Sequence, residues 1–255
     1  LSIDTAQNGV TVWRWLMDAP PPWEDVRPFI QVTHRLQTQG LSAPEIYAAD
    51  EVQGFLLLED LGDASFTRIL RQSPQEERTL YEAAVAALVP LQEKGAVQGE
   101  GLPPYDDAVY MRELLLFTDW FLPQVVGRAR ALEAREAYMA LWQGLLRNAA
   151  FKQQVLVHRD YHADNLLWLP ERQGVARVGM LDYQDALWGD PAYDLASLLE
   201  DARRDVDPAT VLDCIELYVR ARQENREDFS RRYHVLAAQR NAKIIGIFVR
   251  LCVRD

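Results

Sequence analysis

Cysteine is scarce in this chain of 255 residues, and long apolar runs are missing. The only cysteines are Cys214 and Cys252, too few for a disulfide framework and consistent with a reducing compartment. No apolar run approaches the ~20 residues that a membrane-spanning helix requires, and no signal-peptide pattern is present. A net charge of −11 argues against nucleic acid or an anionic membrane as a partner. We therefore expect a cytoplasmic globular protein.

The segment from Val155 to Ala196 carries the most specific pattern in the chain. It contains His158-Arg-Asp160, then Asn165 five residues after that aspartate, then Asp182 at the end of an apolar run. Phosphoryl transfer uses one carboxylate to orient the attacking hydroxyl, and an amide oxygen and a second carboxylate to hold Mg²⁺ on the phosphates. The order and spacing match the catalytic loop and metal-binding aspartate of kinases. The segment therefore indicates a kinase.

Local signals predict that these residues meet in space. Leu166–Leu169 and Arg177–Leu181 are candidate strands, and the loop Pro170–Gly174 between them contains both Pro and Gly. If the two strands pair as an antiparallel hairpin, Asn165 and Asp182 lie at the same end of it. Hard oxygen ligands at that end suit Mg²⁺. The plainer alternative is a solvated acidic turn.

The rest of the chain divides into two unequal parts. Candidate strands at Val10–Met17 and Gly54–Leu58 flank a candidate helix from Glu24 to Gln39. Beyond these the sequence becomes mainly helical, apart from a short strand at Val155–Val157. Four helix starts are marked by Ser73-Pro74, Asp106, Asp190-Pro191 and Asp207-Pro208. We predict a strand-rich lobe over residues 1–60 and a helical lobe over residues 61–255 that contains the catalytic hairpin 155–182.

The catalytic block resembles the aminoglycoside phosphotransferase and choline kinase superfamily. Within that superfamily the chain is most similar to bacterial anomeric kinases that phosphorylate N-acetylmuramate and N-acetylglucosamine at C1 during cell-wall recycling. The resemblance implies an α+β, bilobal protein-kinase-like fold with a small strand-rich N-lobe and a larger helical C-lobe. The matching stretches include HRDYHADN, LDYQDALWGDPAYDLASLL, MDAPPPWEDVRPF, GFLLLEDLGD, ELLLFTDWF and QRNAKIIGIFVRL.

The resemblance also implies a role for each matching residue. Asp160 would be the catalytic base, and Asn165 and Asp182 would be the ligands of Mg²⁺. His158 would hold the shape of the loop. The segment Leu58-Glu59-Asp60-Leu61 would be the interlobe hinge whose backbone meets the adenine of ATP, although the same residues could be an ordinary strand end.

Two features depart from the kinase pattern. No GxGxxG motif precedes Val10, and no lysine occurs before Lys94, so the usual lysine that anchors the α- and β-phosphates is missing. Arg14 is the nearest cationic substitute, unless it is a solvent-facing strand residue. Because Leu1 is not a methionine, we expect that an earlier loop is absent from this sequence. The same departures leave open a non-catalytic nucleotide-binding module.

The acceptor is expected to be a small molecule. Only seven residues separate Asp182 from Asp190, too few for the long activation segment with which a protein kinase docks a peptide. Asp190 and Asp194 are expected to be structural. Candidate substrate contacts flank the catalytic residues or lie on the ELLLFTDWF helix, where core packing and solvated acids are the alternatives. These candidates are Tyr161, His162, Gln184 and Asp185, together with Glu113, Asp119 and Trp120.

The sequence therefore leaves three candidate functions for this protein. The first is an ATP- and Mg²⁺-dependent kinase of an amino sugar of the cell wall, with no protein substrate. The second is an antibiotic-modifying aminoglycoside kinase, for which an acidic C-terminal segment would be typical. The third is the non-catalytic module. The end of the chain, Phe248–Asp255, is not acidic, which favours the first function over the second.

Overall fold

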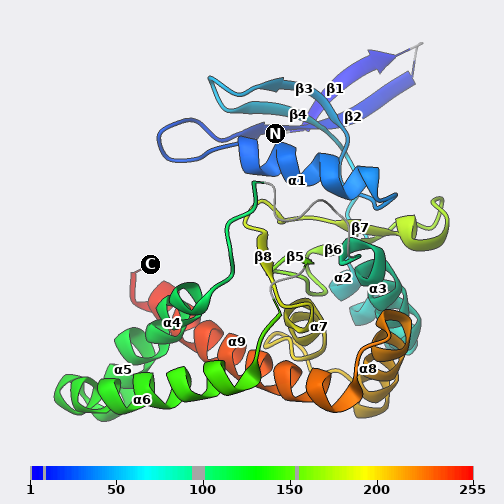
Figure 1. Ribbon diagram of the computed structural model, residues 1–255. Coiled ribbons are helices and arrows are strands. Elements are labelled where there is room, and N and C mark those ends of the chain that lie inside the picture. The colour runs from blue at the N-terminus through cyan, green and yellow to red at the C-terminus, as the bar shows by residue number, and fades with distance from the viewer. Residues whose placement is uncertain (1, 8–9, 94–100, 153–154, 255) are drawn as a thin grey trace. The chain divides into compact units, whose positions relative to one another are not determined.

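The computed structural model describes residues 2–7, 10–93, 101–152 and 155–254 (Figure 1). By their contacts these residues form two compact units. The first unit contains the chain up to Leu91 together with His158–Ala186, and the second contains Gln92–Val157 and the chain from Leu187 onward. The lobe boundary predicted at residue 60 stays a prediction, because the catalytic segment groups here with residues on both sides of it.

The first unit contains a four-stranded antiparallel sheet. Its strands are β1 (Ser2–Gln7), β2 (Val10–Asp18), β4 (Phe55–Glu59) and β3 (Ile46–Asp50), in that spatial order. The two strands predicted from the sequence, β2 and β4, are the central pair. The edge strands β1 and β3 were not predicted, because neither has a run of alternating apolar residues. Edge strands receive less of their stability from burial, so their sequences carry a weaker signal.

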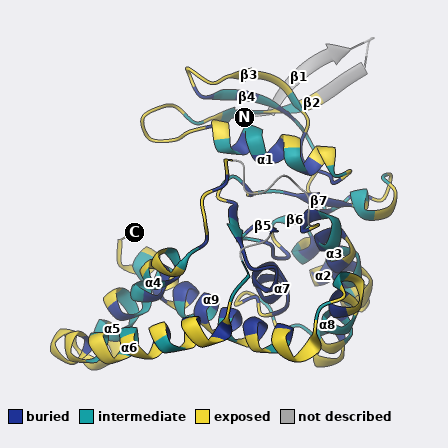
Figure 2. Cartoon of the chain, in the orientation of Figure 1, coloured by how far each residue is buried: buried dark blue, intermediate teal, exposed yellow. Residues whose placement is uncertain are grey.

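Helix α1 (Arg27–Thr38) follows β2. Its apolar side chains Phe29, Val32 and Leu36 are buried, and polar residues occupy its exposed face (Figure 2). The sequence predicts this helix from Glu24, but it begins three residues later, at Arg27. Pro28 stands in the first turn, where the absence of a backbone N–H carries no penalty.

Two helices complete the first unit around the catalytic hairpin. Helix α2 (Phe66–Gln72) begins at Ser65, whose hydroxyl accepts a hydrogen bond from the backbone N–H of Arg68. Helix α3 (Glu77–Leu91) follows a 3₁₀ turn at Pro74–Glu76, and both helices contact the hairpin. The helix predicted to open at Ser73-Pro74 is thus confirmed. The apolar residues that recur at helical spacing along α3 are all buried, namely Leu80, Ala84, Ala87, Leu88 and Leu91.

The second unit is mainly helical. The helix predicted to start at Asp106 is present as α4 (Asp107–Leu116), and a π-helical segment (Phe117–Phe121) and α5 (Leu122–Val126) continue it. Asp106 caps its start by accepting from the N–H of Val109, and Gly127, at φ +84°, ends it. The remaining helices are α6 (Arg128–Ala149), α7 (Ala192–Leu199), α8 (Pro208–Arg222) and α9 (Arg226–Arg254).

Helix α7 is the centre of the second unit. Each of its residues is buried, and Figure 2 shows it wholly in the colour of buried residues. It follows strand β8 (Leu187–Gly189), which pairs antiparallel with β5 (Val155–Val157). Helix α9 contacts both α7 and α4. At Gly246 of α9 an added Cβ would lie 2.3 Å from the backbone carbon of Leu116, so only glycine permits this approach to α4.

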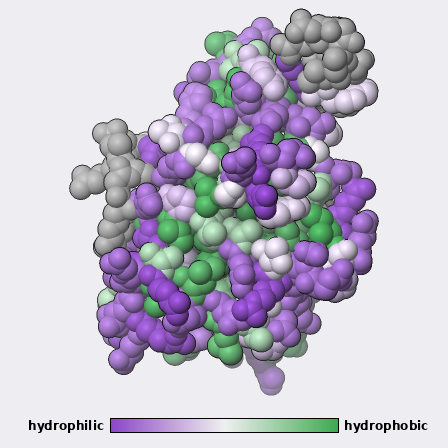
Figure 3. Space-filling view, turned by 90° about the vertical axis from the view of Figure 1, so that its right-hand side faces the viewer, coloured by the Kyte–Doolittle hydropathy of each residue, from purple (hydrophilic) through white to green (hydrophobic). Residues whose placement is uncertain are grey.

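Polar side chains cover most of the face shown in Figure 3, with hydrophobic patches among them. Among the described residues, no helix has the length and apolar character needed to cross a membrane.

A buried ion network fixes the start of α7 against α9. The Nε of Arg232 lies 2.9 Å from Asp190 Oδ2, and its Nη2 lies 3.0 Å from Glu224 Oε2. Asp190 also accepts from the backbone N–H groups of Lys152, at 2.7 Å, and Ala192, at 2.9 Å. Burial raises the pKa of Asp190, while Arg232 and these two N–H groups act in the opposite direction. The structural role predicted for Asp190 agrees with these contacts.

Replacing Arg232 should therefore destabilise the fold. Arg232→Met leaves Asp190 and Glu224 without their shared cation, and breaking a buried pair in this way costs about 3–5 kcal/mol. Arg231→Met is the matched control, because the neighbouring arginine is exposed and pairs with Asp228 in an interaction worth ~1 kcal/mol or less. Urea unfolding followed by circular dichroism measures both. Equal losses in the two variants would contradict the assignment.

Candidate active site

The antiparallel hairpin predicted from the sequence is present. Strands β6 (Leu166–Trp168) and β7 (Val178–Met180) pair with Leu166 opposite Met180. This register brings together the residues that flank the strands, so Asn165 Nδ2 lies 3.3 Å from Asp182 Oδ2. The N–H of Leu181 donates to the carbonyl of Asn165 at 3.0 Å and closes that end of the hairpin. Asn165 and Asp182 are thus neighbours, as the spacing predicts.

The hairpin is held from both sides within the first unit. On one side, Met180 N–H donates to the carbonyl of Ser42, and the Ser42 hydroxyl donates to the carbonyl of Ala176, at 2.8 and 2.6 Å. On the other side, Trp168 N–H donates to the carbonyl of Ala64 at 2.9 Å. A hairpin of two three-residue strands is marginal alone, and these neighbours supply the pairing that stabilises it.

Asn165 links the hairpin to the loop that carries Asp160. Its Nδ2 donates to the backbone carbonyl of Asp160 at 3.0 Å. Because the NH₂ group is directed toward that carbonyl, the Oδ1 of the same amide is available as an acceptor. Asn165 Oδ1 and the Asp182 carboxylate therefore form a small set of hard oxygen donors, which suits Mg²⁺.

This donor set is small. The part of the chain that the structure describes has no group of three or more His, Cys, Asp or Glu side chains placed to hold a metal ion. Mg²⁺ is usually bound by one or two carboxylates, with substrate phosphates and water as the remaining ligands. The residues present therefore fit a magnesium ion that arrives with a nucleotide better than one held by protein alone.

Two residues of the site have left-handed backbone conformations. Arg159 has φ +73° and Asp182 has φ +62°, a region that residues other than glycine seldom adopt. The Arg159 side chain donates to the carbonyl of Asp185 at 3.2 Å, which stabilises the loop locally. Each such residue costs ~1–3 kcal/mol, and conformations of this kind cluster at functional sites.

His158 lies at the base of the catalytic loop, fully buried between two tyrosines. Its ring makes edge contacts with Tyr161, at 5.4 Å, and Tyr183, at 6.2 Å. The Tyr161 hydroxyl donates to the carbonyl of Ala84 in α3, and the Tyr183 hydroxyl lies 2.7 Å from Thr33 Oγ1 in α1. These aromatic residues connect the loop to two helices, which agrees with the structural role predicted for His158. The complete burial of Tyr161 favours a structural role over the predicted substrate contact.

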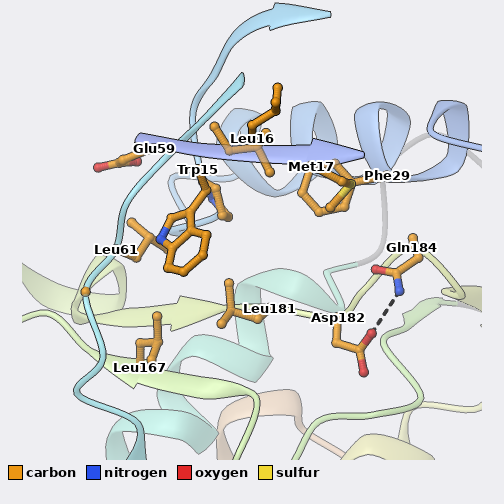
Figure 4. Close-up of a pocket in the computed structure, with 13 residues that line it drawn as sticks. Trp15, Leu16, Met17, Phe29, Glu59, Leu61, Leu167, Leu181, Asp182 and Gln184 are labelled. Atoms are coloured by element: carbon orange, nitrogen blue, oxygen red, sulfur yellow. Dashed lines mark hydrogen bonds between the residues drawn. The ribbon is translucent and has the colours of Figure 1, made fainter. Parts of the chain in front are cut away.

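A mostly apolar pocket lies beside the hairpin (Figure 4). Trp15, Leu16 and Met17 of β2 form one wall, and Leu167 and Leu181 of the hairpin form another. The other lining residues are Phe29, Pro44, Leu58, Glu59, Leu61, Gly62, Asp182 and Gln184. Asp182 accepts a hydrogen bond from the Gln184 amide at 2.8 Å at the polar end of the pocket. The pocket therefore offers apolar surface for a flat ring and oxygen ligands at one end.

The segment predicted as a hinge forms part of this pocket. Leu58, Glu59 and Leu61 line it, whereas Asp60 is not among the lining residues. Glu59 N–H donates to the carbonyl of Glu45 at 2.8 Å, and the Glu59 side chain forms an ion pair with Arg172 in the hairpin loop. The segment is thus connected to the hairpin as well as to the sheet.

Three other residues predicted to contact ATP or the acceptor, Arg14, His162 and Asp185, differ from one another in burial and in neighbours. Arg14 pairs opposite Glu59 in the sheet, its guanidinium lies 4.0 Å from the centre of the Tyr47 ring, and it is not a lining residue of the pocket. His162 is buried, with its Nε2 3.4 Å from Asn165 Nδ2, whereas Asp185 is exposed. Their roles in binding stay predictions.

The predicted contacts on the ELLLFTDWF helix belong to the second unit. Glu113 is buried and pairs with Lys243 of α9 at 3.1 Å. Asp119 pairs with Arg135 at 3.2 Å, and Arg254 lies 4.9 Å from the Trp120 ring centre. Asp194, predicted to be structural, is fully buried in α7, where it accepts from the Gln92 amide at 3.3 Å. None of these contacts tests a role in substrate binding.

A family model described as the phosphotransferase enzyme family matches residues 8–233. The chain belongs to the phosphotransferase enzyme family.

Curated relatives of this phosphotransferase share 35–40% of their residues with it. Those from Caulobacter vibrioides (40% identity, 89% of this chain), Pseudomonas aeruginosa (38%, 94%) and Neisseria meningitidis (35%, 94%) are each named N-acetylmuramate/N-acetylglucosamine kinase. The matched regions cover 64%, 70% and 72% of these relatives, so this chain spans about two thirds of their length.

Solved structures show the fold of this phosphotransferase. The ethanolamine kinase of Plasmodium vivax superposes with a TM-score of 0.63 at 10% identity, over 96% of this chain and 72% of the kinase. The streptomycin–ATP–APH(2")-IIa ternary complex superposes with a TM-score of 0.60 at 15% identity, over 100% of this chain and 91% of that one. The predicted protein-kinase-like fold, with a small strand-containing N-terminal region and a mostly helical remainder, is confirmed.

Sequence reasoning missed the largest side chain in the pocket. Trp15 lies in β2, and Figure 4 shows its indole pointing into the pocket beside Leu61 and above Leu181. The alternation of Trp13, Trp15 and Met17 on one face of β2 is a signal that could have identified it. Residues 8–9, in the stretch before Val10 where the sequence has no GxGxxG motif, lie outside the described residues.

The burial of His158 predicts a pH dependence of stability. Desolvation lowers its pKa to about 4, although Asp160 acts to raise it. The folded state therefore resists protonation while the unfolded state, with a pKa near ~6.5, accepts a proton. The contribution of His158 to stability is fully present above pH ~6.5 and falls as the pH drops toward 4. This group therefore accounts for a loss of about 2 kcal/mol in the free energy of unfolding between pH 7 and pH 5.

His158→Gln should reduce this loss when urea unfolding is measured at the two pH values, whereas replacing the exposed His34 with Gln should leave the loss unchanged. A wild-type pH dependence retained in His158→Gln would refute the assignment.

Proposed function

We propose that this chain is the kinase part of an ATP-dependent phosphotransferase that phosphorylates the C1 hydroxyl of N-acetylmuramate or N-acetylglucosamine. Such a reaction would serve cell-wall recycling in the cytoplasm. The observation that carries the proposal is the arrangement of Asp160, Asn165 and Asp182 around one end of a hairpin, beside a mostly apolar pocket. The names of the curated relatives support the choice of acceptor.

The pocket supports ATP as the phosphoryl donor. A purine ring fits apolar walls such as Trp15 and Leu181, with the backbone of Glu59–Leu61 at its edge. Asn165 Oδ1 and the Asp182 carboxylate would hold Mg²⁺ on the phosphates. When bound, that ion supplies positive charge that offsets the charge of the transferring phosphoryl group. Arg14 is our proposal for the cation that replaces the missing lysine.

Asp160 is proposed to act on the acceptor hydroxyl. A carboxylate is a weak base, so its main contribution is to orient the hydroxyl for in-line attack and to accept its proton as the new bond forms. An anomeric hydroxyl is more acidic than an ordinary alcohol, so this proton transfer is easier. The hydrogen bond from Asn165 to the Asp160 backbone couples the position of the base to that of the metal ligands.

A small acceptor is consistent with the short link after Asp182. Seven residues connect Asp182 to Asp190, and within them Leu187–Gly189 is already strand β8. This connection provides no segment on which a peptide substrate could dock in the manner of a protein kinase.

The proposal predicts phosphate transfer to an amino sugar. With Mg-ATP and a panel of N-acetylmuramate, N-acetylglucosamine, kanamycin and choline, mass spectrometry should detect a sugar 1-phosphate. Asp160→Asn should lower the rate by at least ~10²-fold, because loss of a positioned general base costs 10²–10⁴. Product formed only from kanamycin would identify an antibiotic kinase instead. ATP binding with no transfer to any acceptor would favour the non-catalytic module.

The metal assignment predicts a change in magnesium dependence. Asp182→Asn keeps the shape of the side chain but removes its charge, so the Mg²⁺ concentration for half-maximal activity should rise by at least about tenfold. Glu171→Gln removes an exposed carboxylate from the loop of the same hairpin and should leave the Mg²⁺ titration unchanged. Identical titrations for Asp182→Asn and the wild type would exclude Asp182 as a ligand.

A further inference from the structure

The pocket beside the hairpin has few polar side chains among its 13 lining residues. Apart from the Trp15 indole they are Glu59, Asp182 and Gln184, and none of the residues that line the pocket is a lysine or an arginine. An ionised carboxylate accepts hydrogen bonds but does not donate them. A nucleotide phosphate also accepts, so a side-chain donor for it has to come from the small remainder of this set.

The polar groups lie at two opposite ends of the pocket (Figure 4). Glu59 and Leu61 are at one end, and the indole nitrogen of Trp15 is on the same side. Asp182, our proposed ligand of Mg²⁺, and Gln184 are at the other end. Because protein carboxylates and nucleotide phosphates share the Mg²⁺ ion, the phosphates belong at the Asp182 end. Of the lining side chains at that end, only Gln184 can donate a hydrogen bond.

The amide of Gln184 has a defined orientation. Its Nε2 donates to Asp182 Oδ1 at 2.8 Å, and the other oxygen, Oδ2, lies 3.3 Å from Asn165 Nδ2. Because the carboxylate can only accept, it fixes which side of the Gln184 amide carries the NH₂ group. That group has two N–H bonds, and the contact with Asp182 uses one. Gln184 is partly exposed, so the second N–H can be reached by a ligand in the pocket.

The usual donor to the nucleotide phosphates is missing from this part of the chain. In kinases a lysine of the first lobe contacts the α- and β-phosphates, but no lysine occurs here before Lys94. Arg14, our proposed source of positive charge, does not line the pocket, and its guanidinium lies 4.0 Å from the centre of the Tyr47 ring. A charge acts over such separations, whereas a hydrogen bond needs a donor within about 3 Å of the phosphate oxygen.

We propose that Gln184 binds the phosphates of the donor nucleotide directly, through the second N–H of its side-chain amide, while the first N–H stays on Asp182. This inference rests on the proposed function and names the residue that makes the direct contact for which kinases use a lysine. It also reassigns Gln184 from the acceptor to the donor nucleotide. A neutral donor leaves the charge of Asp182 available to the metal ion.

Binding of adenosine and ADP without metal provides the first test. Calorimetry in the presence of EDTA measures both ligands, with a competition titration for the weaker adenosine. Gln184→Met keeps the length of the side chain and removes both N–H groups. The Kd for ADP should rise by at least about tenfold, the effect of losing one hydrogen bond to a charged group. The Kd for adenosine, which has no phosphate, should stay at the wild-type value.

A second glutamine provides the matched control. Gln173 is exposed in the loop of the same hairpin, so Gln173→Met should leave the Kd of both ligands unchanged. Unchanged adenosine binding in Gln184→Met also shows that the pocket is folded. A loss of adenosine binding as large as the loss of ADP binding would show a structural role for Gln184 and overturn the inference.

The comparison with and without Mg²⁺ separates a direct contact from an effect through Asp182. A direct contact weakens ADP binding in Gln184→Met in EDTA as well as in Mg²⁺. A loss that is present only with Mg²⁺ would show that Gln184 merely positions the metal ligand, and would overturn the inference. Gln184→Lys restores a donor and should bind ADP at least as tightly as the wild type. A lysine variant as weak as the methionine variant would also overturn it.

The outcomes distinguish this inference from the function on which it rests. ADP binding that is unchanged in Gln184→Met would overturn the phosphate contact and leave the kinase function in place. The expected pattern of Kd values, in a wild-type chain that transfers phosphate to no sugar, would support the contact and overturn the sugar kinase function. A wild-type chain that binds neither ADP nor ATP would overturn both.

Discussion

The antiparallel pairing of β6 with β7 is the constraint on which the site depends. Two strands of three residues each bring Asn165 and Asp182 to the same end, although seventeen positions separate them in the chain. The hydrogen bond from Asn165 to the Asp160 backbone extends this order to the preceding loop. A slip of one residue in the pairing would turn the flanking side chains to the opposite face and separate the oxygen ligands.

The surrounding structure offsets the cost of holding this loop. Arg159 and Asp182 occupy left-handed backbone conformations, and His158 is buried in a neutral state. Backbone hydrogen bonds donated by the hairpin to the carbonyls of Ser42 and Ala64, together with the anchored rings of Tyr161 and Tyr183, provide compensating contacts within the same unit. Packed elements of the same unit therefore help to hold the site residues in place.

Two buried arginines of helix α9 in the second unit differ in their ion pairs. Arg232 lies between two carboxylates and connects α9 to the start of α7, whereas no carboxylate among the described residues pairs with Arg240, two turns later on the same helix. A buried guanidinium without a carboxylate partner lowers the stability of the fold. The two arginines, although similarly buried, therefore differ in what they contribute to stability. Arg232 therefore stabilises the fold through its two carboxylate partners.

The sequence by itself determined the features that depend on short-range patterns. The hairpin, the apolar face of α3 and the helix starts at Asp106 and Asp207 follow from spacing, turn residues and caps, which act over a few positions. Only the tertiary structure decided that Trp15 lines the pocket, that Tyr161 is buried and that Arg240 lacks a carboxylate partner in the described chain. Each of these depends on which distant side chains arrive beside the residue, and periodicity in one segment carries no information about the neighbours that long-range packing brings to it.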